Sequence, residues 1–178
     1  YHYGSAVIKR NIDVAIIWYS LAAAKGNIEA ISQLGFIYLI GKHNKDWEPD
    51  HEKAKKYFLI LANQGDMNAM LKMAEIQRNL KKYLEAETWY ERYLNKEKDD
   101  EIHWTTYRDI ADLYGDVPPS FPNGWEKMGK FNKLALNKAL THVEQYKAKK
   151  NGYALVSIGE FYERGTEDSI GVKRNYLE

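Results

Sequence analysis

Apolar residues recur along this chain at intervals of three and four, which is the spacing of one face of an α-helix. The row Ala15, Trp18, Tyr19, Ala22 and Ala23 is one example. Rows of this kind, separated by turn-forming residues, predict pairs of helices, each pair with a first and a second member. We expect helices at about 11–25, 28–40, 50–64, 67–79, 82–96, 101–114, 125–149 and 152–164.

Two sequence phrases occur more than once, which indicates a repeated structural unit. Ala30, Leu34, Gly35, Tyr38 and Gly41 return as Ala154, Ile158, Gly159, Tyr162 and Gly165. The row from Ala15 to Gly26 returns as Ala54, Tyr57, Phe58, Leu61, Ala62 and Gly65. Internal periods of this length are typical of stacked helical hairpins. The repetition therefore predicts an all-α array of stacked antiparallel helix hairpins.

Small and aromatic residues within the phrases predict how the helices pack. Gly35 is expected at a close crossing of two helices, where a larger side chain would push them apart. Aromatic residues are expected to fill the wider gaps: Trp18, Tyr19, Tyr38, Tyr57 and Phe58.

Turn chemistry supports the same helix boundaries. Gly26 and Gly65 are placed to end a helix in the left-handed conformation. Side chains suited to cap helix N-termini stand where the predicted helices begin. They are Asn11, Asn27, Asp50, Asp66, Asn151 and Asn175.

The repeats are not uniform along the chain. We expect a single array with units at about 1–26 (partial), 27–65, 66–98, 99–150 (irregular) and 151–178 (partial). The 66–98 unit has a shorter loop, and the 99–150 unit holds a proline-rich loop at 116–124 followed by a lysine-rich helix. Both ends look like parts of repeats, so we expect the chain to be an excerpt of a longer array.

Composition changes this picture little. The 178 residues are 44% hydrophobic and 29% charged, with a net charge of +1, so no global charge favours nucleic acid or an anionic membrane. There is no cysteine, which excludes disulfides and thiol chemistry but is compatible with cytoplasm, periplasm or secretion. The sequence contains no apolar run long enough to span a membrane and does not open with a signal peptide.

The repeated phrases resemble Sel-one-like repeats, a subclass of the tetratricopeptide-like helical repeats. The units at 27–65 and 151–178 match the family pattern well, residues 4–26 match its second half, and 66–98 has the tighter tetratricopeptide spacing. The resemblance implies a right-handed α-solenoid with a concave face. It also implies a non-catalytic adaptor or scaffold that binds other proteins, often in bacterial signalling, secretion or host interaction.

Transferring the groove positions of the family gives candidate contact residues on the first helices. Those chosen are Ser32, Phe36, Leu39, Leu71, Glu75, Arg78, Arg108, Asp112, Glu160 and Arg164. Phe36 and Leu39 stand out because apolar side chains on an exposed face suggest a contact. The alternative is that a neighbouring helix covers both.

Three segments could carry other chemistry, and each has a simpler explanation. His43 and His51 lie among carboxylates in 42–52 and could ligate a metal, although the spacing matches no known closed site. Pro119 and Pro122 form a PxxP match that a spacer loop also explains. The lysines of 125–149 could meet an acidic partner or simply face solvent.

We therefore expect a non-enzymatic module without cofactor or metal, whose partner is another protein or peptide and not nucleic acid or a membrane. One alternative is an immunity or inhibitor protein that masks a toxin or enzyme. Others are a metal-dependent enzyme using the 42–52 loop and a purely structural spacer. The sequence does not identify the partner, the compartment or the oligomeric state.

Overall fold

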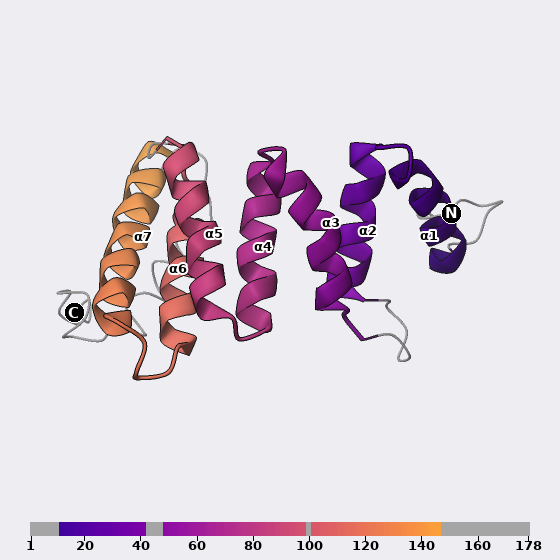
Figure 1. The fold of residues 1–178 in the computed structure, drawn as a ribbon. Coiled ribbons are helices and arrows are strands. Elements are labelled where there is room, and N and C mark those ends of the chain that lie inside the picture. Colours follow the sequence, from indigo (N-terminus) through magenta and orange to yellow (C-terminus); the bar gives the residue numbers. More distant parts are fainter. Residues whose placement is uncertain (1–10, 42–47, 99–100, 147–178) are drawn as a thin grey trace. The chain divides into compact units, whose positions relative to one another are not determined.

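The computed structural model describes residues 11–41, 48–98 and 101–146, and this part of the chain is built from helices joined by turns (Figure 1). Its helices are α1 (Ile12–Ala23), α2 (Ile28–Ile40), α3 (His51–Asn63), α4 (Met67–Asn79), α5 (Tyr83–Lys96), α6 (Trp104–Asp116) and α7 (Gly124–Tyr146). The predicted all-α class is confirmed. None of the described helices is both long and apolar enough to cross a membrane.

The predicted helix boundaries agree with the structure, with the largest differences around the irregular fourth unit. Helix α6 begins at Trp104 and not near 101, because a turn precedes it. In that turn the N–H groups of Glu101 and Ile102 donate to the carbonyl of Lys98 at 3.0 and 3.2 Å. The helix expected at 152–164 lies outside the described residues.

Side chains cap the N-termini of α1, α2, α3 and α4 as the sequence predicts. In each case the side-chain oxygen of the capping residue accepts a hydrogen bond from the backbone N–H three residues later. The pairs are Asn11 with Val14 at 3.1 Å, Asn27 with Ala30 at 2.9 Å, Asp50 with Lys53 at 2.9 Å and Asp66 with Ala69 at 2.7 Å. Asn151 and Asn175 lie outside the described residues.

The helices α1, α3 and α4 end in the same kind of turn. Gly26 and Gly65 adopt φ values of +79° and +91°, as expected for glycines that end a helix. After α4 the equivalent residue is Lys81, with φ +58°. Its N–H donates to the carbonyl of Arg78 at 2.8 Å, just as the Gly65 N–H donates to Ala62 at 3.0 Å. A lysine therefore adopts after α4 the left-handed conformation that a glycine adopts after α1 and after α3.

The chain divides into two compact units, which we describe separately: Tyr1–Tyr93 and Leu94–Glu178. In the first unit α1 packs on α2, α2 on α3 and α3 on α4. Its most deeply buried large side chains are Leu34, Phe58, Met73 and Ile76. In the second unit α6 packs on α7, and Ile110 and Leu113 are fully buried.

Gly35 lies at a close helix crossing, as predicted. A Cβ atom added to Gly35 would stand 3.0 Å from Cε2 and Cζ of Phe58 in α3, which is tighter than ordinary van der Waals contact. Phe58 itself is only 1% exposed. The missing side chain therefore lets α2 approach the Phe58 ring directly.

The aromatic residues of the repeat fill gaps in α2 and α3, whereas Trp18 of α1 does not. Tyr38 and Tyr57 stack with ring centroids 5.8 Å apart and planes 2° apart. The expectation that Trp18 is packed is wrong, because 59% of its surface is exposed. Trp18 corresponds to Tyr57 in the repeat. Tyr57 is covered by Tyr38 of the preceding helix, whereas no described helix precedes α1.

Candidate functional site

The candidate contact residues on α2 are Ser32, Phe36 and Leu39. This α2 row is partly buried within the first unit. Ser32 and Phe36 are half-buried, and the Phe36 ring meets Phe58 edge-on, with centroids 5.2 Å apart and planes at 84°. Leu39 is only 7% exposed. The expectation of an exposed Leu39 is therefore wrong, since the fold covers this side chain. Of the apolar residues singled out on this helix, only Phe36 remains partly accessible.

The candidate row on α4 is more open and carries both charges. Leu71, Glu75 and Arg78 follow one another at intervals of four and three, so they share one side of the helix. All three are half-buried. The Lys72 amine donates to the Glu75 carboxylate at 2.7 Å, which fixes the acidic member of the row. This side of α4 thus presents an apolar, an acidic and a basic side chain in sequence.

The buried face of α4 explains why this row is well positioned. Met73, Ala74 and Ile76 lie in the core of the first unit, each 1% exposed or less. Because those residues alternate with the candidate row, the helix cannot rotate without exposing apolar surface. The row therefore keeps a fixed orientation on a rigid support.

The second unit carries the remaining described candidates on α6. The guanidinium of Arg108 lies 5.3 Å from the Trp104 ring centroid and 4.0 Å from the Asp109 carboxylate. Asp112 is half-buried one turn further along. The other two candidates, Glu160 and Arg164, lie outside the described residues.

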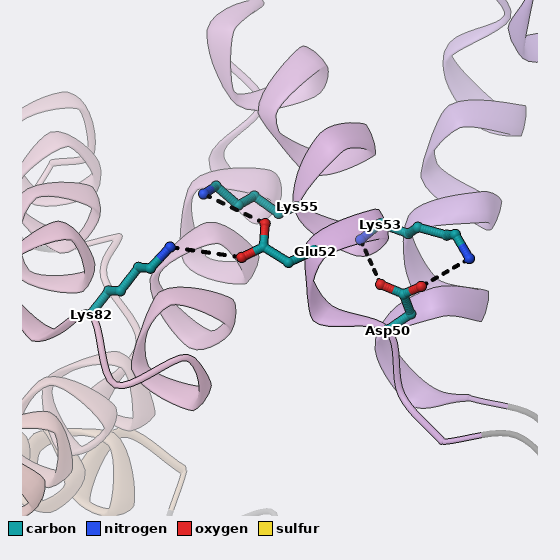
Figure 2. A network of polar contacts seen from close by, with 5 residues as sticks. All are labelled: Asp50, Glu52, Lys53, Lys55 and Lys82. Carbon is teal, nitrogen blue, oxygen red and sulfur yellow. Dashed lines mark hydrogen bonds and ion pairs between the residues drawn. The ribbon is translucent and has the colours of Figure 1, made fainter.

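A polar network stands at the start of α3 (Figure 2). Asp50 bonds to both the backbone N–H and the side-chain amine of Lys53, at 2.9 Å each. The Glu52 carboxylate lies 3.9 Å from the Lys55 amine and 3.7 Å from the amine of Lys82, which immediately precedes α5. These pairs are well exposed, so each adds little to stability. Asp50 fixes the N-terminal end of α3, and Glu52 links α3 to the residue before α5.

Three pKa values are shifted in this network and beside it. Hydrogen bonds from the backbone N–H and the amine of Lys53 lower the pKa of Asp50. The bond to Asp50 in turn raises the pKa of Lys53. Burial raises the pKa of Tyr57, whose ring stacks on Tyr38. The Lys53 amine also lies 5.2 Å from the Tyr38 ring centroid, which joins the aromatic pair to the charged network.

The loop proposed as a metal site is only partly described. Residues 42–47, which include His43, lie outside the described residues. Asp50 caps α3, as the simpler interpretation predicts. Elsewhere in the described ranges no three histidine or carboxylate side chains gather as metal ligands would.

The proline loop folds back on its own unit and is not an extended polyproline segment. The N–H of Phe121 donates to the Pro118 carbonyl at 2.8 Å, which closes a turn. The Phe121 ring lies 6.2 Å from that of Tyr114. Gly124 is buried, and an added Cβ would meet Val117 at 3.0 Å. This loop anchors the α6–α7 hairpin.

Two lysines of the lysine-rich helix lie close to aromatic rings. The amine of Lys127 lies 5.5 Å from the Tyr114 ring centroid and 6.0 Å from that of Phe121. The Lys130 amine lies 5.6 Å from the Phe131 centroid. These lysines cover aromatic rings of their own unit. Lys130 is nevertheless exposed, so the interpretation of this helix as a surface for an acidic partner stays a prediction.

Two local arrangements escaped the sequence analysis. His103 caps α6, with its Nδ1 atom 2.8 Å from Oγ1 of Thr105. The cluster of Lys53 with Tyr38 and Tyr57 was also missed, although the repeat already places the two tyrosines on paired helices. Histidine is an uncommon cap, so the usual preferences for capping residues do not select it.

Comparison with known proteins identifies the repeat. The family model for the Sel1 repeat matches residues 1–27, 28–66 and 152–178, which together make up just over half of the chain. No curated protein and no solved structure shows significant similarity to it. The matched segments include the α2–α3 hairpin, where Gly35 meets Phe58. The chain therefore belongs to the Sel1 repeat family of tetratricopeptide-like helical repeats.

Proposed function

We propose that this protein is a non-enzymatic scaffold that binds another protein through the candidate rows of its first helices. Sel1 repeats generally mediate protein–protein interaction, and this supports the class of function. In the first unit, the accessible parts of the rows are Ser32 and Phe36 on α2 and Leu71, Glu75 and Arg78 on α4.

The observation that carries the proposal is the half-buried α4 row. Side chains that are already partly ordered lose less entropy when a partner binds. Leu71 supplies an apolar contact, and Arg78 belongs to a residue type that is enriched among the dominant contacts of interfaces. Glu75 is fixed by Lys72 and can accept hydrogen bonds from a partner. The row is thus suited to a peptide segment with mixed polarity.

The test begins with the chain as bait and mass-spectrometric identification of a stoichiometric partner. Binding of the purified partner is then measured by calorimetry for Arg78→Ala and for Lys56→Ala, a matched change on the exposed side of α3. We expect Arg78→Ala to weaken binding about tenfold or more, as loss of a dominant contact does. Lys56→Ala should bind like the original protein. The reverse result would contradict the proposal.

A further inference from the structure

Helix α1 carries an apolar surface that the described residues of the first unit leave exposed. Ile17 and Trp18 are each 59% exposed, and Leu21 is 55% exposed. Asp13 is the sole charged residue within the bounds of this helix. Three large apolar side chains within five residues form a contiguous patch of the kind that marks an interaction site.

The repeat provides an internal comparison for this surface. Aligning Ala15 with Ala54 and Ala86 gives the residues that α3 and α5 hold at the places of Ile17 and Leu21. They are Lys56 and Ile60 in α3 and Thr88 and Arg92 in α5, all of them exposed. Three of these four are polar, so stacking of the repeats does not require apolar side chains at these places. The character of α1 therefore calls for another explanation.

The exposed residues lie on a ridge that is complementary to itself. Asp13, Ile17 and Leu21 of α1 follow at intervals of four, which places them along one i±4 ridge, and Lys25 follows four residues later in the turn after the helix; we call these four residues the α1 ridge. It runs from an acid through two apolar side chains to a base. The small residues Ser20 and Ala24 lie beside it and are exposed, which leaves room for an opposing ridge.

We infer that the α1 ridge is a self-association surface, on which α1 of a second copy packs in the antiparallel direction. With a two-fold axis near Tyr19, Ile17 faces Leu21 of the second copy, and Asp13 faces Lys25. A two-fold interface uses the same patch on both molecules, so the patch must complement itself, as this ridge does in polarity and charge. The inference concerns α1 alone and does not depend on the proposed function of the first-helix rows.

Sedimentation of the full 178-residue chain over a range of concentrations tests the association. We expect a monomer–dimer equilibrium for the original protein. Ile17→Lys with Leu21→Arg introduces the residue types that α3 and α5 hold at these places, and should shift the protein to monomer with unchanged helical content. Leu59→Lys on the exposed side of α3 is the matched control and should dimerise normally.

Charge reversal tests the antiparallel register. Asp13→Lys and Lys25→Asp should each weaken dimerisation by about fivefold, the size expected for exposed ion pairs. The double reversal should restore it, because acid again faces base. A monomeric original protein, a ridge variant that dimerises normally, or a double reversal that fails to restore association would each overturn the inference.

Discussion

Gly35 shows how one missing side chain determines the packing of a repeat. Phe58 occupies the space that a Cβ atom would need, and its ring is held in turn by Phe36 at 5.2 Å. Alanine is the better helix former by about 1 kcal/mol, so helix propensity alone would favour its substitution. The buried ring opposes this gain.

We expect Gly35→Ala to destabilise the protein by about 1 kcal/mol, because the close contact outweighs the propensity, and Gly35→Leu to cost considerably more. The matched control is Gly115→Ala in α6, where the nearest atom is Met128 Sδ at 3.8 Å. That change should stabilise by about 0.5 kcal/mol. Urea unfolding followed by circular dichroism measures both. Equal stabilisation at the two sites would refute the role assigned to Phe58.

Asp50 gives a second prediction, which depends on pH. Its pKa is lowered below the ordinary 3.8, so the ionised form stabilises the folded state. This contribution is complete above the ordinary pKa and is lost as the pH falls through the lower value of the folded protein. Asp50→Asn keeps an acceptor for the Lys53 N–H but cannot ionise.

We therefore expect Asp50→Asn to be slightly less stable than the original protein near neutral pH, with the difference disappearing in acid below the folded pKa. Asp50→Ala should lose the cap itself, at a cost of about 1 kcal/mol near neutral pH. Thermal unfolding across the pH range measures both variants. A difference between Asp50→Asn and the original protein that grows in acid would contradict the assignment.

At the scale of elements, the turn between α4 and α5 departs from its equivalents. Lys81 holds the left-handed conformation that Gly65 holds after α3. A residue with a Cβ pays roughly 1 kcal/mol in that region, and glycine does not. The turn is therefore formed against the preference of its own residue.

Lys81→Gly is expected to stabilise the protein by about 0.5–1 kcal/mol, because it relieves this strain. The reciprocal change Gly65→Lys should destabilise by a similar amount. Denaturant midpoints compare the two. A lower stability of Lys81→Gly would contradict this prediction. It would mean that the lysine side chain stabilises the fold by more than its left-handed backbone conformation destabilises it.

The helices and their caps could be predicted from sequence because they depend on neighbours along the chain. Asn27 caps α2 through a residue three positions away, and Gly26 ends its turn locally. The exposure of Leu39 and Trp18 could not be predicted in this way. The exposure of each side chain depends on whether another helix packs against it. Similar residues at equivalent positions of the repeat can therefore differ in burial. The described candidate residues therefore lie on the helices expected for them, but how deeply each is buried could not be predicted.

At the scale of the whole molecule, each unit has its own core. The role that we propose is binding of a protein partner by the first-helix rows, without catalysis. The α4 row is the most accessible of those in the first unit, since Leu39 on α2 is buried. The outer side of α3 has a different character, with Lys56, Leu59 and Ile60 exposed. A partner that binds as proposed must contact α4 and leave this side of α3 uncovered.

Site-specific photocrosslinking to the identified partner tests this most directly. A benzophenone side chain is placed at Leu71 on the α4 row or at Leu59 on the outer side of α3, so that the same residue type is replaced at both sites. We predict that the partner crosslinks to the chain labelled at position 71 and not to the chain labelled at 59. Crosslinking from 59 without crosslinking from 71 would show that the protein binds its partner through the second helices, and would contradict the assignment of binding to the first-helix rows.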